Sequence, residues 1–337
     1  MQEYDKKPAS GLGQIIAPYR EAVEKSLAEI AQSNTQLGIF AAESLKAGGK
    51  RLRPAVALLA CETLSGKYEL AVPLATAYEL AHSASLIQDD VIDESPLRHD
   101  GPTIQKKYGV INAMLASDVL LFKAFEAFSK YGKTKLSKAA LAQLLETFSK
   151  SAIATAEGEF LEMNLASKNQ VSVDEYLNVA GLKTGSLFAA CAASGALVGG
   201  ATKSEVDFMY EFGYNLGVSF QIKDDVLDIL GNTKETGKPL MEDLKNNASN
   251  YVIIDALSKA DASKKNQIAA MVLKKWFTFD EVERLVQTLK EIGSIDRAES
   301  VAMAFAERAR EMLTVFPPST AKDNLLQITY FLGVRRD

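Results

Sequence analysis

The chain has 337 residues, of which 47% are hydrophobic and 24% are charged, and its formal net charge at pH 7 is −5. This length and apolar content allow a large buried core, in one or two domains. The small negative charge excludes the overall basic field of a nucleic-acid-binding protein, so no nucleic acid is expected as a partner.

Apolar residues keep helical spacing along most of the chain, and alternating β-branched runs bounded by hairpin turns are missing. The predicted helices, in chain order, cover residues 16–32, 38–47, 53–65, 73–92, 110–131, 137–163, 173–200, 203–231 and 279–314. The stretch 179–199 is apolar around most of its circumference, which is typical of a helix inside a bundle. The sequence therefore predicts an all-α protein with a single helical domain over residues 1–337.

The cysteines and the apolar segments bear on the compartment. Cys61 and Cys191 lie far apart and outside any Cys-x-x-Cys pair, so we expect buried thiols and neither a disulfide framework nor a zinc site. The N-terminal residues lack the apolar run of a signal peptide. A continuous stretch of about 18 apolar residues is also missing, so no membrane span is expected. These features predict a cytoplasmic protein.

Two acidic clusters of the form Asp-Asp-x-x-Asp each end a long apolar helix. They are Asp89, Asp90 and Asp93, and Asp224, Asp225 and Asp228. Residues four apart share a helix face, so the first and last carboxylates of each cluster point together. Three carboxylates within five residues repel one another and call for a cation. Oxygen ligands without His or Cys suit Mg²⁺, which bridges carboxylates to phosphates. A solvated helix end would explain one cluster, but two copies favour a diphosphate bound through magnesium.

Basic residues from four parts of the chain could match a polyanionic substrate. They are Lys50, Arg51 and Arg53 in the segment GGKRLRP, Arg98 after the first cluster, Lys183 inside an apolar helix, and Lys238 in a Gly-Lys-Pro turn. Glycines allow the backbone to approach a phosphate closely, and an arginine fork fits its oxygens. Each signal is modest alone, because a basic turn is usually a solvated one.

In their order along the chain, the motifs GGKRLRP, DDVID, LKTGSLF, FQIKDDVLD and GKP resemble those of the trans-isoprenyl diphosphate synthase family, also called polyprenyl synthetases. The resemblance covers roughly residues 15–335. It implies an isoprenoid synthase fold, which is a bundle of long helices around a central active-site cavity, usually in a homodimer. It also implies an enzyme that condenses isopentenyl diphosphate with an allylic diphosphate.

The resemblance further implies a role for each matching residue. Asp89 and Asp93 would hold two Mg²⁺ ions and Asp224 a third, with Asp90, Asp225 and Asp228 supporting them. Lys50, Arg53 and His82 match positions that bind the diphosphate of isopentenyl diphosphate. Arg98, Lys183 and Lys238 match those that bind the allylic diphosphate, and Thr184 and Gln221 match groups beside the reacting carbons. His82 precedes Asp89 by seven residues, or two helical turns, so both lie on one face.

By the same analogy, residues on the first aspartate helix limit the length of the product. Ala81, Ala84 and Ser85 are small, so a short C15 floor is not expected. Tyr78 lies eleven residues before Asp89, about 16 Å away on the same face, and could form the floor. The expected product is C20 (geranylgeranyl diphosphate) or longer.

Two positions depart from the family pattern. His99 stands where a second arginine usually grips isopentenyl diphosphate, and a neutral imidazole would bind it less strongly. Ala248 replaces a familiar lysine, and Lys245, three residues earlier, is the candidate to substitute for it. These departures leave open a non-catalytic helical subunit that regulates another synthase. A plain helical interaction protein with solvated aspartates is a second alternative.

Overall fold

The computed structural model describes residues 11–46, 48–98, 101–133, 136–166, 168, 170–230, 249–272, 274 and 278–334. The chain divides into two compact units that alternate along the sequence. The first unit comprises the described residues of Met1–Ser149, Ala190–Tyr210 and Met312–Phe331, and the second those of Lys150–Ala189, Glu211–Glu311 and Leu332–Asp337. Several helices contribute residues to both units, and the expected single domain stays a prediction.

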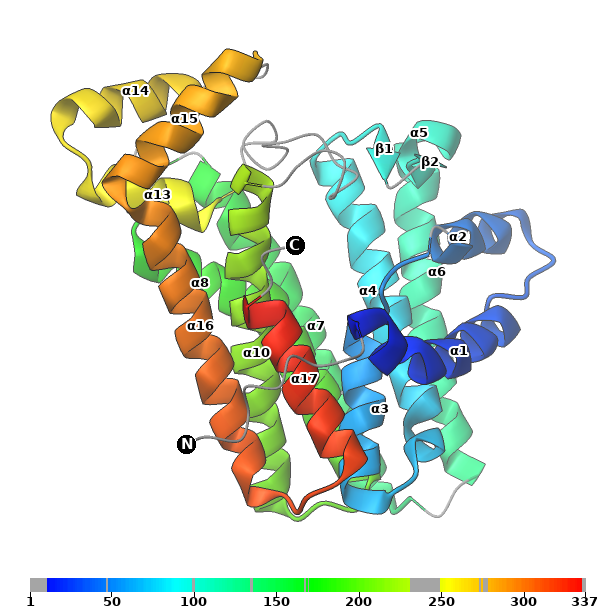
Figure 1. Ribbon diagram of the computed structural model, residues 1–337. Helices are drawn as coiled ribbons and strands as arrows, with labels where there is room; N and C mark the ends of the chain where they lie inside the picture. The colour runs from blue at the N-terminus through cyan, green and yellow to red at the C-terminus, as the bar shows by residue number, and fades with distance from the viewer. Residues whose placement is uncertain are drawn as a thin grey trace. The chain divides into compact units, whose positions relative to one another are not determined.

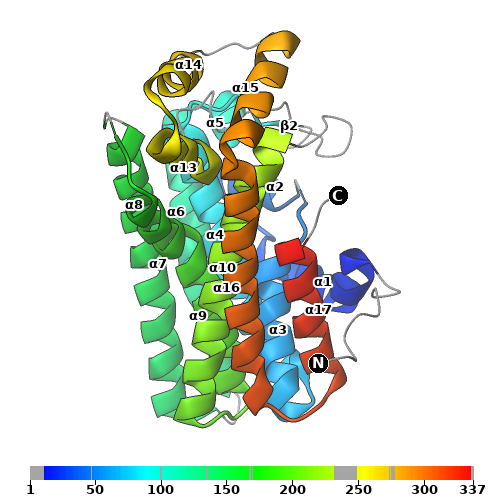
Figure 2. The same cartoon turned by 60° about the vertical axis from the view of Figure 1, so that its left-hand side comes forward.

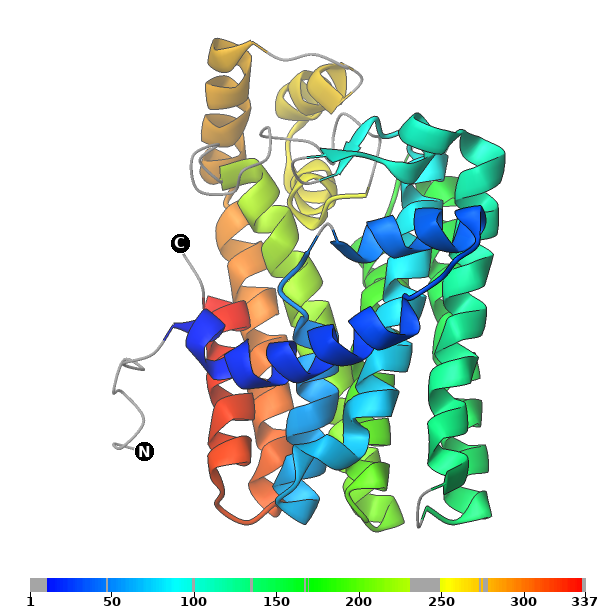
Figure 3. The ribbon, with the colours of Figure 1, turned by 90° about the vertical axis from the view of Figure 1, so that its right-hand side faces the viewer.

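The N-terminal part of the first unit is a layer of packed helices (Figure 1). Its elements are α1 (Leu12–Ile30), α2 (Gln36–Lys46), α3 (Leu52–Ser65), the 3₁₀ turn η1 (Tyr68–Ala71) and α4 (Val72–Ile92). Helix α4 has a proline in its first turn, where a backbone N–H would have no intrahelical acceptor and its absence costs no hydrogen bond. Figure 3 shows α1 crossing α3 and α4, both of which it contacts. Helix α4 is therefore held from several sides, and its last turn carries the first aspartate cluster.

A short connection and two long helices follow α4. The elements are the strands β1 (Leu97–Arg98) and β2 (Gly101–Pro102), α5 (Ile104–Tyr108), α6 (Val110–Ser129), the 3₁₀ turn η2 (Lys130–Lys133) and α7 (Lys138–Ala166). The two strands pair antiparallel, with Leu97 opposite Pro102 and Arg98 opposite Gly101. This pair was not expected from the sequence, because two-residue strands leave no alternating pattern. Helix α6 packs along α4, its principal neighbour in the first unit.

The next helical stretch contains a π-helical turn. The elements are α8 (Val173–Ala180), the π turn η3 (Gly181–Gly185), α9 (Ser186–Val198) and α10 (Lys203–Leu230). Ser172 caps α8 and Glu175 closes a capping box with it. The turn η3 contains Lys183 and Thr184, and single π turns inside α-helices are frequent at functional sites.

The C-terminal elements divide between the two units, and those from Tyr251 to Glu311 contribute to the core of the second. They are α13 (Tyr251–Lys259), α14 (Ala262–Val272), α15 (Phe279–Ile292), α16 (Ser294–Met312), the 3₁₀ turn η4 (Leu313–Val315) and α17 (Thr320–Val334). Figure 2 shows α13, α14 and α15 gathered at one end of α16. One buried apolar cluster joins α8, α10, α13, α14, α15 and α16, and it includes Ile222, Tyr251 and Ala298.

The observed helices confirm the all-α prediction and most of the expected ranges. The range 279–314 is broken, because Gly293 takes a left-handed conformation (φ 74°) that ends α15 before α16 begins. Helices α13, α14 and α17 were not among the predicted ranges, since their apolar patterns are short.

The cysteines and one long apolar stretch also bear on the predictions. Cys61 and Cys191 are free and fully buried, as expected. The stretch Val173–Val198 is long and apolar enough to cross a membrane by length and composition, which corrects the expectation that the chain has no such stretch. However, 78% of its most apolar window is buried inside the protein, as in the core helix of a globular protein, so it is weak evidence for a span.

Candidate functional site

The first aspartate cluster lies in the first unit, at the end of α4. Its middle member, Asp90, is buried, and its Oδ1 accepts hydrogen bonds from Arg98 through Nε and Nη2, each at 2.8 Å. The side chain of Gln105 donates to the backbone oxygen of Asp90. Asp89 is only partly buried and Asp93 is exposed. The cluster therefore contains one carboxylate that holds the following β1–β2 segment and two that are accessible.

The second cluster lies in the second unit, in the last turns of α10. Its middle member, Asp225, is fully buried, and its Oδ2 accepts a 2.6 Å hydrogen bond from the backbone N–H of Tyr251. The amide of Gln221 donates to Asp225 Oδ1 at 3.1 Å. Asp224 is exposed and Asp228 is partly buried. Here too the middle carboxylate is bound within the protein, at the N-terminus of α13.

The accessible carboxylates fit a hydrated cation. Asp89 and Asp93 are four residues apart, with Asp93 N–H donating to Asp89 O at 2.9 Å, so the helical turn continues through both. Asp224 and Asp228 have the same spacing within α10. Among the described residues, no group of three or more His, Cys, Asp or Glu side chains is placed to hold a metal ion by itself. Mg²⁺ is usually held by one or two carboxylates together with substrate phosphates, so two carboxylates per helix suit it better than a complete protein cage would.

The basic segment GGKRLRP begins α3 in the first unit. Arg53 Nη1 lies 3.1 Å from His82 Nε2, so the structure brings together two residues that were assigned to one substrate. Burial, and then the nearby Arg53, Arg98 and Arg51, hold the pKa of His82 well below its usual value. The imidazole is therefore neutral near pH 7, and its Nε2 accepts a hydrogen bond from Arg53. Lys50 is exposed at the start of this segment.

Lys183 sits in the π turn η3 and contacts two carboxylates of α7. Its Nζ lies 2.6 Å from Glu162 Oε2 and also contacts Glu159. Gly158 permits this approach, because a Cβ there would lie 2.6 Å from the backbone nitrogen of Lys183. Neither glutamate was predicted from the sequence, although acidic residues three apart beside a glycine on a long helix were a signal that could have identified them.

Thr184 and Gln221 are also brought together, within the second unit. Thr184 Oγ1 donates to Gln221 Oε1 at 2.8 Å, while the Gln221 amide nitrogen donates to Asp225. The result is a continuous hydrogen-bonded chain from the π turn to the second aspartate cluster. The sequence assigned these two residues to one role from the family resemblance, and the structure shows that they are direct partners.

The residues expected to limit product length lie along α4. Tyr78 is fully buried, its hydroxyl lies 2.9 Å from Ser194 Oγ, and its ring packs edge-on against Phe148. Ala84 is buried, whereas Ala81 and Ser85 are partly buried. The large side chain at Tyr78 is thus fixed by neighbours, and the positions between it and Asp89 are small.

Some expected site residues cannot be placed. His99, Lys238, Lys245 and Ala248 lie outside the described residues.

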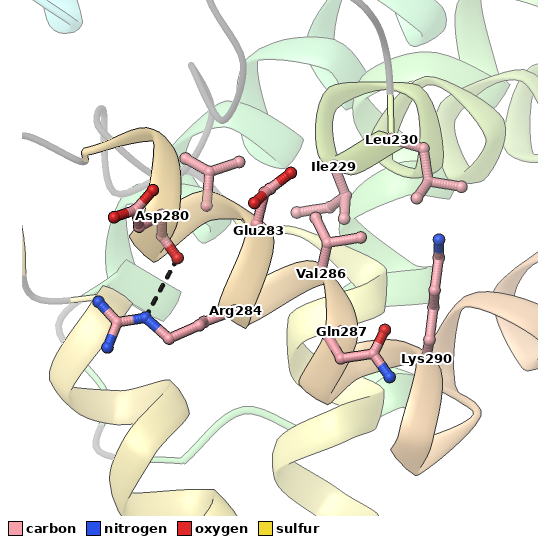
Figure 4. Close-up of a pocket in the computed structure, with 9 residues that line it drawn as sticks. Ile229, Leu230, Asp280, Glu283, Arg284, Val286, Gln287 and Lys290 are labelled. Atoms are coloured by element: carbon pink, nitrogen blue, oxygen red, sulfur yellow. Dashed lines mark hydrogen bonds between the residues drawn. The ribbon is translucent and has the colours of Figure 1, made fainter.

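An open groove of about 890 Å³ lies between the end of α10 and α15 (Figure 4). It is lined by Ile229, Leu230, Asp280, Val282, Glu283, Arg284, Val286, Gln287 and Lys290. None of the expected site residues lines it, so this groove is distinct from the candidate site.

The chain is similar to known proteins in both sequence and structure. Residues 35–289 match the family model described as polyprenyl synthetase. The chain is 35% identical over 289 residues to a geranylgeranyl diphosphate synthase of Methanosarcina mazei, covering 85% of this chain and 86% of that protein. It is 36% identical over 284 residues to a geranylfarnesyl diphosphate synthase of Aeropyrum pernix, covering 84% and 88%.

A solved structure is similar over nearly the whole chain. The geranylgeranyl pyrophosphate synthetase of Pyrococcus horikoshii superposes with a TM-score of 0.89 at 30% identity, covering 96% of this chain and 99% of that one. The similarity therefore extends through both compact units.

Proposed function

The chain belongs to the polyprenyl synthetase family, and we propose that it condenses isopentenyl diphosphate with an allylic diphosphate to give a prenyl diphosphate of C20 or longer. The observation that carries the proposal is the pair of aspartate clusters. In each, the middle carboxylate is bound within the protein, while the first and last are four residues apart and more exposed than the middle one.

The accessible aspartates are the proposed metal ligands. Asp89 and Asp93 would hold two Mg²⁺ ions and Asp224 a third, with Asp228 supporting, while Asp90 and Asp225 fix the two helix ends. When bound, Mg²⁺ supplies Lewis-acid stabilisation of the negative charge that develops on the departing diphosphate. Because the first and last aspartates of each cluster share a helix face, this stabilisation would act from one face of each helix.

The basic residues divide between the two substrates. Lys50, Arg53 and the neutral His82 bind the diphosphate of isopentenyl diphosphate, and His99 binds it less strongly than an arginine would. Arg98, Lys183 and Lys238 bind the allylic diphosphate. An ammonium has three donors, so Lys183 can join Glu159 and Glu162 to a diphosphate oxygen.

The hydroxyl of Thr184 and the side-chain oxygen of Gln221 place partial negative charge beside the allylic carbocation, which the double bond of isopentenyl diphosphate attacks. Loss of a proton to the departing diphosphate then restores a double bond. Apolar helix faces around the reacting carbons exclude water that would otherwise quench the cation.

Product length depends on α4 in this proposal. The buried ring of Tyr78 forms the floor, and the small residues Ala81, Ala84 and Ser85 leave room above it. Ala84→Phe should shorten the product, and Tyr78→Ala should lengthen it. Chain-length analysis of the reaction products measures both changes, and an unchanged product spectrum in both variants would refute this placement of the floor.

The decisive test of activity uses the purified chain alone with Mg²⁺, labelled isopentenyl diphosphate and allylic primers of increasing length. Production of C20 or longer prenyl diphosphates supports the proposal, and addition of EDTA should abolish it. Absence of turnover by the chain alone, with activity restored by a second synthase, would instead favour the non-catalytic subunit. Failure to bind diphosphate in the presence of Mg²⁺ would favour an interaction protein without a catalytic site.

A homodimer and a cytoplasmic location complete the proposal. The homodimer is supported by an apolar stripe on α6, where Ile111 is 77% exposed, Phe122 is 69% exposed, and Leu115 lies on the same face. Light scattering should give twice the monomer mass for the chain and the monomer mass for Ile111→Glu/Phe122→Glu.

The proposed cytoplasmic location is supported by the two free, buried cysteines and is tested by cell fractionation.

A further inference from the structure

The segment from Gly48 to Arg53 has a backbone conformation that side chains normally avoid. Gly48 and Gly49 have positive φ, but Arg51 also has a left-handed backbone, with φ 52° and ψ 38°. Of the residues that the structure describes, only Glu94 is another non-glycine with positive φ. Such a residue persists where its surroundings fix it, and it often lies at a functional site. The arginine at position 51 must therefore contribute something that a third glycine could not.

The side chain of Arg51 binds three separate segments of the first unit. Its Nε donates to Glu24 Oε1 on α1 at 2.8 Å, and its Nη1 donates to Glu79 Oε1 on α4 at 2.5 Å. Its Nη2 donates to the backbone oxygen of Leu45 at the end of α2, at 2.8 Å. A planar guanidinium can satisfy three acceptors in fixed directions, which a lysine cannot do. The side chain thus connects α1, α2 and α4 to the start of α3.

These contacts distinguish Arg51 from its two basic neighbours. The side chain of Arg51 is 3% exposed and that of Glu79 is 4% exposed, whereas Lys50 is exposed. A substrate diphosphate could reach Arg51 only by displacing a buried carboxylate and leaving that charge uncompensated, which is strongly unfavourable. Arg51 is therefore poorly suited to bind the substrate itself.

The two arginines of the segment contact consecutive turns of one helix. Arg51 binds Glu79, and Arg53 binds His82, three residues further along α4. Seven residues beyond His82, the same face reaches Asp89. These two contacts therefore fix the segment against α4, the helix that carries the first aspartate cluster.

We propose that Arg51 is a positioning residue whose contacts with Glu24, Glu79 and Leu45 hold the left-handed turn, so that Lys50 and Arg53 together meet the diphosphate of isopentenyl diphosphate. The inference rests on the proposed function for the identity of that diphosphate. The anchoring of the turn is independent of it.

The first experiment replaces Arg51 with methionine in the full chain. Arg51→Met should raise KM for isopentenyl diphosphate about 10- to 100-fold, because small displacements of binding groups weaken productive binding. KM for the allylic diphosphate should stay within about twofold, because its proposed ligands lie elsewhere. Arg51→Lys should behave like Arg51→Met, since a charge without the fork cannot hold all three acceptors. If Arg51→Lys retains the wild-type KM, charge alone suffices and the proposal is overturned.

A second variant separates positioning from stability. Arg51→Met/Glu79→Met replaces the buried ion pair with apolar side chains, an exchange that is often neutral or stabilising. Its melting temperature should return toward the wild-type value, while KM for isopentenyl diphosphate stays raised. Recovery of KM together with stability would show that Arg51 acts only through global stability, and would overturn the proposal.

Amide hydrogen exchange provides a readout that needs no turnover. Exchange of residues 48–53 should be faster in Arg51→Met than in the wild type, and faster than in Lys50→Ala, which leaves the three contacts of Arg51 in place. Equal exchange in Arg51→Met and the wild type would overturn the anchor even if the enzyme is active. If the wild type neither turns over nor binds isopentenyl diphosphate, the proposed function fails, and the exchange result still decides whether Arg51 holds the turn.

Discussion

The two aspartate clusters share one sequence motif but are fixed in different ways. Asp90 is held by a charged side chain, Arg98, whose own side chain is 32% exposed. Asp225 is held by the backbone N–H of Tyr251 and by the Gln221 amide, and it is fully buried. In both, the middle carboxylate is bound to the segment that follows its helix, and the outer two are more exposed than the middle one. The difference shows that the partner that fixes the middle carboxylate of this motif varies with the local fold.

The largest expected effect is the loss of activity when an outer carboxylate of either cluster is removed. Asp89→Ala and Asp224→Ala should each reduce kcat by at least about 10²- to 10³-fold, because each removes a proposed metal ligand where charge develops. Initial rates at saturating substrates and varied Mg²⁺ measure the loss. Glu94→Asn is the matched control, because it removes a nearby exposed carboxylate and asparagine tolerates the positive φ at this position. A loss in the control equal to that in Asp89→Ala would argue against the assignment.

Removal of the middle carboxylate should lower the stability of the protein by different amounts in the two clusters. Asp225→Ala should lower the free energy of unfolding by about 3 kcal/mol, because it leaves the buried Tyr251 N–H and the Gln221 amide without their acceptor and removes a negative charge from the N-terminus of α13. Asp90→Ala should lower it by only about 1 kcal/mol, since the partly exposed Arg98 can be hydrated. Urea unfolding of both variants measures the difference. Equal losses would show that the two anchors are equivalent.

The sequence predicted the parts of the site that depend on local spacing. The helical period placed α3, α4 and α10, and the i, i+4 rule identified which aspartates share a face. The family resemblance grouped Thr184 with Gln221 and Arg53 with His82, and the structure finds each pair in contact. Their catalytic roles stay predictions.

The remaining features depend on which helix faces meet. The contact of Lys183 with Glu159 and Glu162 requires a π turn and the close approach at Gly158, and neither follows from an apolar pattern. Likewise, the left-handed Arg51 is stabilised by Glu24 and Glu79, which are 27 and 28 residues away in the chain. Propensity alone would place a glycine there.

Arg98 and Lys183, both proposed to bind the allylic diphosphate, offer a third contrast. Arg98 contacts one carboxylate, whereas Lys183 contacts two. Lys183→Ala should raise KM for the allylic diphosphate about 10- to 100-fold, since a charge-assisted hydrogen bond is lost and two carboxylates are left uncompensated near the substrate. Adding Glu159→Gln should recover about fivefold of this loss by removing one of those charges.

Steady-state kinetics of the single and double variants measures this coupling. Glu157→Gln is the matched control, because Glu157 is an exposed carboxylate two residues away on α7. If Glu157→Gln recovers as much as Glu159→Gln in the Lys183→Ala background, the effect is one of general surface charge, and the specific contact with Lys183 is not responsible.

The smallest expected effect concerns pH and is confined to the first cluster, because α4 carries His82 and the second aspartate helix, α10, has no histidine. Burial and neighbouring arginines depress the pKa of His82 in the folded protein. The unfolded chain therefore binds a proton at this residue as the pH falls through about 6.5, while the folded chain does not. Stability should fall with decreasing pH in this window, with a slope of at most about 1.4 kcal/mol per pH unit from this group. Urea unfolding between pH 7.5 and 5.5 should show a shallower slope in His82→Gln than in the wild type, and identical slopes would mean that the folded protein accommodates a charged His82.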